Sequence, residues 1–299
     1  MNHANAYLYS FTHYKNLEAI LGVSFDLVDL RFQQNVKQFS PKLGLLWNIT
    51  DSTVIRAAYF QGIKKRFNAN QTIEPIQIAG FVQFLDNDSA TGAPYKQVGL
   101  GLDHKFNQSL YFGLEGIYRQ TKVPMPVIDR LFTGETTLLK VNTNRKNEYS
   151  ASSYINWTPN KYISTSLEYR LSVFNQRSDD QFFNKNEVVH QIPLSINYFA
   201  PNGFYSKFRA TYIYQKTKSD PSASELNSKN KNHLWSLDAL LGYRLPKRYG
   251  RLEFGVKNLL DDGNENVSAK GNVSVSNSQE INLLPERTFF GQLVFDFDF

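Results

Sequence analysis

The chain ends in an alternating run of apolar and polar residues whose last member is a phenylalanine. Successive side chains of a β-strand point to opposite faces, so the apolar members of this run share one face. An exposed face of this kind on a strand in water would promote edge pairing and aggregation. A closed barrel with lipid outside and water inside provides both environments that the run requires. The apolar face comprises Leu293, Phe295, Phe297 and Phe299, opposite Gln292, Asp296 and Asp298.

The bulk composition fits a transmembrane barrel better than a helical membrane protein. Mean hydropathy is -0.43, charged residues make up 20% of the chain, and no segment reaches the roughly eighteen consecutive apolar residues of a spanning helix. A barrel keeps its apolar residues at alternate positions, so its average hydropathy stays low. The 17 Tyr and 23 Phe residues are enough for aromatic girdles at both membrane interfaces.

Cysteine content and charge exclude several classes of function. With no cysteine, the chain has no thiolate metal site, cysteine nucleophile or disulfide. The net charge of +6 is spread along the sequence and forms no basic stripe. We therefore expect no nucleic-acid partner and interpret the charge as a solvated surface of mixed sign in the lumen and loops.

Alternation predicts thirteen strands, each long enough to cross a membrane at a tilt. Their connections alternate between short turns rich in turn-forming residues and long polar loops. The long loops are expected at 28-38, 63-94, 122-144, 177-186, 218-232 and 261-286. The short turns are expected at 50-51, 107-109, 158-160, 200-203 and 246-250. The strands are expected at 5-14, 17-27, 39-50, 52-62, 95-106, 109-121, 145-158, 161-176, 187-199, 203-217, 233-245, 249-260 and 287-299.

This alternation of short turns and long loops predicts an all-β fold: a transmembrane, antiparallel, up-and-down β-barrel in the bacterial outer membrane. The short turns would lie in the periplasm and the long loops outside, which leaves Phe299 at the periplasmic edge. Thirteen strands is an odd number, whereas single-chain bacterial barrels have even counts, so we expect about 13-14 strands here and further strands upstream. The start of the chain resembles no signal peptide. Either a signal peptide was removed or the chain is the C-terminal part of a longer polypeptide; we favour the second and interpret residues 1-299 as a single barrel domain.

The segment from Ile76 to Leu85 looks like a strand but does not fit the count. Inserting it as a spanning strand would reverse the order of short and long connections. We therefore expect residues 76-85 to form a hairpin within an extracellular loop or a segment directed into the lumen.

Aromatic residues distinguish the barrel from a soluble β-sandwich, whose half-buried strands alternate in the same way. Each of them lies beside a short turn, as expected for a periplasmic girdle. They are Trp47, Trp157, Tyr198, Tyr243 and Phe299.

The residues opposite the apolar positions form the predicted lumen face, with ten basic and nine acidic side chains. This near balance predicts no strong ion selectivity. Most of these groups are expected to solvate the wall and form cross-strand pairs, while some line a path for a solute. The basic residues are Lys42, Arg56, Lys105, Arg119, Arg170, Lys207, Arg209, Arg244, Arg251 and Lys257. The acidic residues on the candidate path are Glu115, Glu168, Asp238 and Glu253; the remaining ones are Glu18, Asp26, Asp103, Asp296 and Asp298.

Catalytic and metal-binding patterns are missing from the sequence. The five histidines form no compact arrangement with serine or aspartate and no zinc-binding motif. Residues 86-88 and 261-264 are rich in oxygen ligands but lack the spacing of a calcium loop, so turn formation explains them better. We therefore expect no enzymatic activity, metal or cofactor.

Several strings resemble those of TonB-dependent receptors, the ligand-gated transporters of the outer membrane. Residues 39-45 and 55-62 are similar to a mid-barrel hairpin of that family, residues 254-261 to its penultimate strand, and residues 284-290 to its final loop and strand. The terminal Leu293, Phe295, Phe297 and Phe299 resemble the assembly signal of outer-membrane barrels. The resemblance implies the C-terminal portion of a barrel of about 22 strands. It also implies outer-membrane lipid and the barrel-assembly machinery as partners.

The leading hypothesis is an outer-membrane receptor that passes a small-molecule or oligosaccharide solute through a polar lumen. The family's N-terminal plug and TonB-contacting box have no counterpart in this sequence, so TonB is an expected partner only if a plug lies upstream. Two alternatives remain open. One is a passive or secretory porin without a plug, of the polysaccharide-export type, and the other is an adhesive structural barrel.

Overall fold

The strands form one large antiparallel sheet. The computed structural model describes residues 2-29, 35-64, 74-83, 92-130, 136-177, 185-219, 229-262 and 286-295. Thirteen strands pair in the order β1-β2-β3-β4-β7-β8-β9-β10-β11-β12-β13-β14-β15, and β5 and β6 form a separate two-stranded sheet. Each strand of the large sheet is thus bonded to its neighbours along the chain, which confirms the predicted all-β, up-and-down architecture.

Each of the thirteen predicted segments corresponds to one strand of the large sheet, with shifts at the ends that are largest for the strands at 109-121 and 145-158. The first six are β1 (Asn2–Tyr14), β2 (Leu17–Asp29), β3 (Val36–Thr50), β4 (Thr53–Ile63), β7 (Pro94–Lys105) and β8 (Leu110–Arg130). The others are β9 (Thr136–Asn160), β10 (Ile163–Arg177), β11 (Lys185–Phe199), β12 (Phe204–Ser219), β13 (Lys229–Arg244), β14 (Gly250–Lys257) and β15 (Thr288–Phe295). The small sheet consists of β5 (Gln77–Ile78) and β6 (Phe81–Val82).

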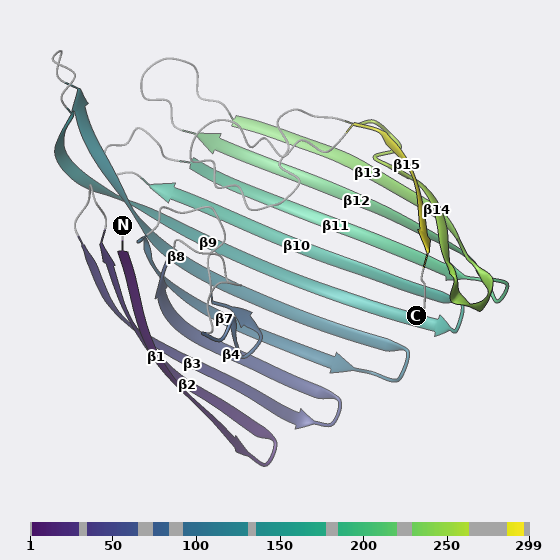
Figure 1. The fold of residues 1–299 in the computed structure, drawn as a ribbon, viewed down its shortest axis with the longest axis horizontal. Helices are drawn as coiled ribbons and strands as arrows, with labels where there is room; N and C mark the ends of the chain where they lie inside the picture. Colours follow the sequence, from purple (N-terminus) through teal and green to yellow (C-terminus); the bar gives the residue numbers. More distant parts are fainter. Residues whose placement is uncertain are drawn as a thin grey trace.

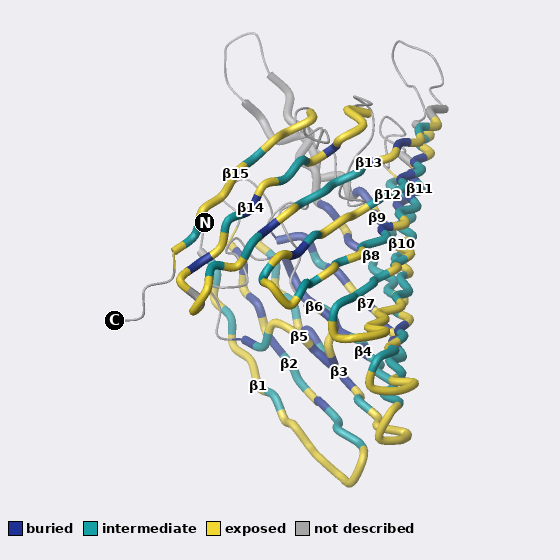
Figure 2. Tube along the Cα trace, turned by 90° about the vertical axis from the view of Figure 1, so that its right-hand side faces the viewer, coloured by how far each residue is buried: buried dark blue, intermediate teal, exposed yellow. Residues whose placement is uncertain are grey.

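The large sheet curves into a wall around an interior space (Figures 1 and 2). Short turns connect the strands at one end of the sheet (Figure 1). Strands β1 and β15 are the two edges of the sheet in the described part of the chain. The small sheet lies inside the curve, next to β2, β3 and β4 (Figure 2).

The pairing registers define the two faces of the wall. One row of directly paired residues crosses five strands on the outer face and is entirely apolar or aromatic: Leu21, Leu43, Tyr59, Val98 and Tyr118. The adjacent row on the inner face is mixed and mostly polar: Gly22, Lys42, Phe60, Gln97 and Arg119. Large apolar side chains such as Leu8, Phe39 and Leu241 are exposed on the outer face. An apolar outer face of this extent suits lipid contact.

The predicted aromatic girdle lies where the short turns are. Trp47, Trp157 and Tyr198 are exposed on the outer face, and Tyr243 packs against Phe204 with ring centroids 4.7 Å apart. Phe299 lies outside the described residues, as does Phe297. Leu293 and Phe295 of the predicted assembly signal are both exposed on the outer face of β15.

The predicted loop at 122-144 is wrong, because β8 and β9 continue as a long hairpin to Arg130 and Thr136. Pro124 and Pro126 lie within β8 and do not end it. Beyond Thr121, β8 pairs only with β9. Amide groups two residues apart point to the same edge of a strand, so both prolines can lack their N–H on the unpaired edge at little cost.

The predicted turn at 158-160 is displaced by a few residues. Strand β9 runs to Asn160, and the turn is formed by residues 161 and 162. The side-chain Oδ1 of Asn160 accepts hydrogen bonds from the backbone N–H groups of Tyr162 (2.8 Å) and Ile163 (3.1 Å). An asparagine that binds the backbone two residues ahead organises a turn by itself, which is why the turn follows Asn160 and not Pro159.

Helical structure contributes little to the described residues. A short 3-10 helix, η2 (Pro246–Arg248), lies in the turn between β13 and β14. In the described part of the chain, no helix has the length and apolar character needed to cross a membrane.

Cysteine labelling tests the assignment of the two faces. Leu167 pairs with Ile155 and Leu194 on the outer face, and the next residue, Glu168, lies on the inner face. In outer membranes of cells that produce the protein, we expect Leu167→Cys to be shielded by lipid from a hydrophilic maleimide and Glu168→Cys to react readily. The two variants are matched controls for each other, and the reverse labelling pattern would overturn the register.

Candidate functional site

Residues 74-83, which we call the lumen hairpin, project from the connection between β4 and β7 onto the inner face of the wall. Ala79 and Gly80 have positive φ angles of 48° and 85°, as required at both central positions of the tight turn that joins β5 to β6. Gln77 pairs with Val82, and Ile78 pairs with Phe81. The sequence left open whether this region forms a hairpin within a loop or a segment directed into the lumen; in the described residues it is a hairpin that packs on the inner face.

Apolar contacts hold the tip of the lumen hairpin against the wall. Ile78, Ala79 and Phe81 are buried in one cluster with wall residues Ile20, Ala58, Phe60 and Tyr95. The strands beneath them carry glycines, and any side chain there would clash with the hairpin. A Cβ added to Gly44 would lie 2.7 Å from Ile78 Cγ2, and one added to Gly99 would collide with the Phe81 ring. Glycines on the inner face therefore provide the space into which the hairpin packs.

A buried polar group, which we call the anchor cluster, fixes the base of the hairpin. It consists of Tyr9, Lys42, Glu74 and Gln83. Lys42 Nζ lies 3.1 Å from Glu74 Oε1 and donates a hydrogen bond of 2.6 Å to Gln83 Oε1. Tyr9 OH donates to Glu74 Oε1 at 2.7 Å. Lys42 and Glu74 are almost fully buried, so the charge of each depends on the other for stabilisation.

Arg56 links the hairpin to three further strands. Its guanidinium lies 5.2 Å from the centroid of the Phe81 ring, Nε donates to Asp103 Oδ2 at 2.9 Å, and Nη2 donates to Glu115 Oε2 at 3.3 Å. Asp103 also accepts a 2.8 Å hydrogen bond from Tyr154 OH on β9. Arg56 therefore combines a cation–π contact with two ion pairs, and both contact types favour a fixed orientation.

A third set of contacts joins the hairpin to β7 and β8. Gln97 Nε2 donates to the backbone oxygen of Val82 at 3.3 Å, and Arg119 Nε donates to Gln97 Oε1 at 2.7 Å. Arg119 Nη1 lies 3.6 Å from Glu148 Oε2. The hairpin is thus held by contacts from β1, β3, β4 and β7.

The surface of the hairpin away from the wall faces the interior. Ile76 and Val82 are exposed there with 47% and 44% of their surface accessible, and Gln77 and Gly80 are exposed beside them. The hairpin occupies interior space over β2, β3, β4 and β7 (Figure 2). The arrangement can therefore narrow the passage along the wall and present a partly apolar surface to a passing molecule.

The registers place all fourteen candidate path residues on the inner face. Their role in a solute path stays a prediction. Of these residues, Lys42 and Arg56 contact the hairpin directly. Glu115 binds Arg56, and Arg119 binds Gln97, which in turn binds the hairpin. Of the others, Glu168 and Arg170 form an ion pair, and Lys105 lies over the Tyr111 ring. Asp238, Glu253, Lys207, Arg209, Arg244, Arg251 and Lys257 lie over β12, β13 and β14.

Sequence reasoning missed the partners that give the site its structure. Tyr9, Glu74 and Gln83 were not recognised as inner-face contacts, because they lie far from Lys42 along the chain. The detectable signal was the presence of Gly22, Gly44 and Gly99 at inner positions of neighbouring strands, since a glycine within a strand marks a close approach by another group.

The structure offers no cluster of metal ligands within its described residues. Asp261 Oδ1 accepts the backbone N–H of Arg287 at 2.9 Å, and Asp262 Oδ2 accepts that of Trp235 at 3.2 Å. These two aspartates therefore bind backbone groups, as expected for turn chemistry. Residues 86-88 lie outside the described part of the chain.

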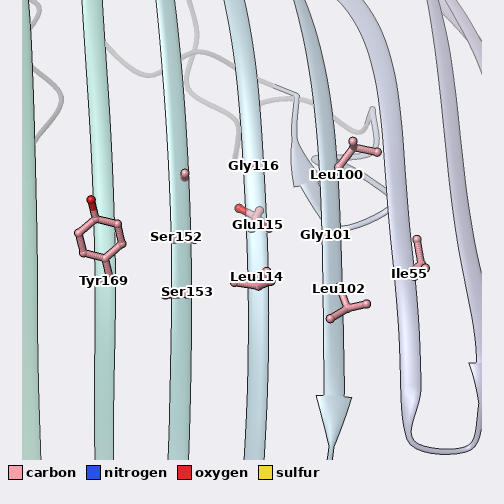
Figure 3. A pocket seen from close by; sticks show the side chains of 11 residues that line it. Ile55, Leu100, Gly101, Leu102, Leu114, Glu115, Gly116, Ser152, Ser153 and Tyr169 are labelled. Carbon is pink, nitrogen blue, oxygen red and sulfur yellow. The ribbon is translucent and has the colours of Figure 1, made fainter.

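A hollow lies on the outer face of the wall, separate from the lumen hairpin. It is open, has a volume of about 560 Å³ and is lined by residues of β4, β7, β8, β9 and β10. Its floor lies at Gly116, where an added Cβ would meet no atom within 4 Å. Tyr169 stands at one side and Ile55 at the other (Figure 3). Because this surface is the apolar outer face, the hollow belongs to the lipid-facing side of the wall and not to the interior.

Comparisons with known proteins reveal similarity at the level of the fold. No protein-family model matches the sequence, and no curated protein matches it. Among solved structures, the outer membrane transporter YddB from Escherichia coli matches with a TM-score of 0.64 and 13% identity, over 97% of this chain and 44% of YddB.

Two iron-related receptors match in the same way. The ferric-catecholate import receptor Fiu from E. coli K12, in its open form, gives a TM-score of 0.54 at 9% identity, over 85% of this chain and 52% of Fiu. The siderophore receptor PiuA from Acinetobacter baumannii gives 0.56 at 9% identity, over 86% of this chain and 47% of PiuA. This chain thus spans about half the length of the receptors that it matches.

These matches confirm the resemblance to TonB-dependent receptors predicted from the sequence, at the level of the fold. The chain has the fold of the barrel wall of outer-membrane receptors and transporters, and thirteen strands of such a wall are described.

Proposed function

We propose that this chain forms part of the wall of an outer-membrane transporter and that a small solute passes along its polar inner face. The observation that carries the proposal is the combination of a lipid-suited outer face with a hydrated inner face onto which a hairpin is firmly fixed. A wall built only to anchor surface loops would not need an internal hairpin. The proposal assigns no catalytic role to the chain.

The solved structures with this fold support the proposal, since their names describe import and transport across the outer membrane. A siderophore or a comparable small molecule is therefore a reasonable solute class, with an oligosaccharide as the other class that the polar lumen would suit. Outer-membrane lipid and the barrel-assembly machinery are the further partners that we propose. Dependence on TonB is proposed only for a polypeptide that also carries a plug.

Within this function, the lumen hairpin acts as a constriction. Its contacts with β1, β3, β4 and β7 hold it in place, while Ile76 and Val82 face the passage. A constriction of this kind also favours the second candidate function, a passive porin whose size limit is set by an internal loop. The two candidates differ in whether an energised plug is needed, and conductance measurements distinguish them.

Removal of the hairpin tests the constriction. Replacing residues 76-82 by a short glycine–serine linker should increase ion conductance through the protein in planar bilayers, because the interior over β2, β3, β4 and β7 becomes free. Gln77→Ala is the matched control, since this side chain is exposed and its loss should leave conductance within about twofold. Equal conductance of the deletion and the control would contradict the constriction.

The anchor cluster gives a second prediction. Lys42→Met removes the ammonium group that lies 3.1 Å from the buried Glu74 carboxylate, which should cost about 3–5 kcal/mol and release the hairpin from the wall. Hydrogen–deuterium exchange of amides in residues 76-83 should then become faster by at least a hundredfold, while strand amides of β3 stay protected.

Two further variants complete this experiment. Lys96→Met removes a lysine that is exposed on the outer side of β7 and should leave exchange unchanged. The double variant Lys42→Met with Glu74→Gln removes both charges and should restore part of the protection, because no unpaired charge stays buried. Unchanged exchange in Lys42→Met would show that the ion pair does not hold the hairpin.

A further inference from the structure

Ion pairs are distributed unevenly over the inner face. Beneath and beside the lumen hairpin, the three cations Lys42, Arg56 and Arg119 each have an acidic partner. Over β12 and β13, by contrast, Lys207 and Arg244 have no ion-pair partner among the described residues, and both side chains are exposed to the interior. In the part of the chain that the structure describes, the cations beside the hairpin are therefore paired, whereas Lys207 and Arg244 on the other side are not.

Two of the exposed cations face each other directly. Arg244 of β13 pairs in register with Arg251 of β14, and the next pair on this face is Gly242 with Glu253. Directly opposite residues have Cβ atoms about 5 Å apart, and like charges at such positions destabilise a strand pair. The sheet does not require this arrangement, since a neutral residue at either position would preserve the hydrogen-bond ladder.

Tyr205 and Glu253 organise these cations into one group. Lys207 Nζ and Arg244 Cζ each lie 5.6 Å from the centroid of the Tyr205 ring. Tyr205 OH donates a 2.5 Å hydrogen bond to Glu253 Oε1, and Arg251 Nε lies 3.6 Å from the same oxygen. These contacts join Lys207, Arg244 and Arg251 to a single carboxylate, that of Glu253, either directly or through Tyr205, so the group has an excess of two positive charges.

We propose that Lys207, Arg244 and Arg251 form a binding site for an oxyanion, namely a carboxylate or phosphate group of a soluble solute. The two guanidinium groups supply forked donors that suit such a group, and Lys207 adds a point charge. The Tyr205 ring makes cation–π contacts with Lys207 and Arg244, and the hydrogen bond from Tyr205 OH to Glu253 fixes the ring. A bound oxyanion removes the repulsion between Arg244 and Arg251, which explains why both arginines occupy opposed positions.

This site goes beyond the proposed transport and does not depend on it, because its signature is equilibrium binding. The group lies close to the turn between β13 and β14, at the end of the wall where the short turns are (Figure 1). The lumen hairpin contacts β3, β4 and β7, so the two features occupy different parts of the inner face.

Calorimetric titration of the protein in an uncharged detergent tests the site, with inorganic phosphate and, separately, citrate as probes at low ionic strength. We expect one bound anion per chain, and the tighter probe identifies the preferred group. Arg244→Gln and Arg251→Gln should each weaken binding by about tenfold or more, because each removes a charge-assisted donor. Arg244→Lys keeps the charge without the fork and should recover part of the affinity.

Lys247→Gln is the matched control. This exposed lysine lies in the turn between the two arginines, so its replacement changes the net charge equally while leaving the site intact, and affinity should change less than twofold. Absence of anion binding, or an equal loss in Lys247→Gln and Arg244→Gln, would overturn the proposal.

Thermal unfolding provides a readout that is independent of calorimetry. Without anion, Arg244→Gln should be at least as stable as the native protein, because repulsion between opposed arginines is removed. Phosphate should raise the Tm of the native protein more than that of Arg244→Gln, since a ligand stabilises a fold more strongly the more tightly it binds. Equal phosphate-dependent shifts in both proteins would contradict the assignment.

Discussion

Backbone hydrogen bonding between antiparallel strands is the constraint on which the rest of this structure depends. In lipid, each unpaired N–H or C=O group costs several kcal/mol, so a spanning wall must pair every strand on both sides. Strands β2 to β4 and β7 to β14 meet this requirement, while β1 and β15 each present one edge in the described part of the chain. In a membrane these edges need partners, whether each other or strands supplied from elsewhere.

The same constraint explains why the wall could be predicted from sequence. A strand between lipid and water must alternate at a period of two, and a one-residue slip would exchange its faces. All thirteen strands were recognised on this basis. The prediction failed at residues 122-144, which were expected to form a long polar loop, whereas β8 and β9 continue there as a hairpin in which β8 pairs with β9 alone.

The site was only partly predictable, because period-two alternation gives the face of a residue but not its partner. Lys42 and Arg56 were assigned to the interior, as cations expected to solvate the wall. In the structure, Lys42 is buried against Glu74, and Arg56 against Phe81. These contacts depend on how a connecting segment folds back onto the wall, which no strand pattern encodes. The glycines at inner positions of the strands were the sequence feature that indicated this packing, since they leave space on the inner face for the connecting segment.

The charges of the inner face link the hairpin to the oxyanion site. A cation paired with a buried carboxylate attracts an anionic solute only weakly, because the two charges largely cancel. An exposed cation without a partner attracts anions from the surrounding water. Among the residues that the structure describes, the cations beside the hairpin are therefore paired, whereas Lys207 and Arg244 of β12 and β13 are exposed without an ion-pair partner. An anionic solute that entered this interior would be excluded by the hairpin from β3, β4 and β7 and attracted towards Lys207, Arg244 and Arg251. The hairpin and the arginine pair thus direct such a solute along the same side of the wall.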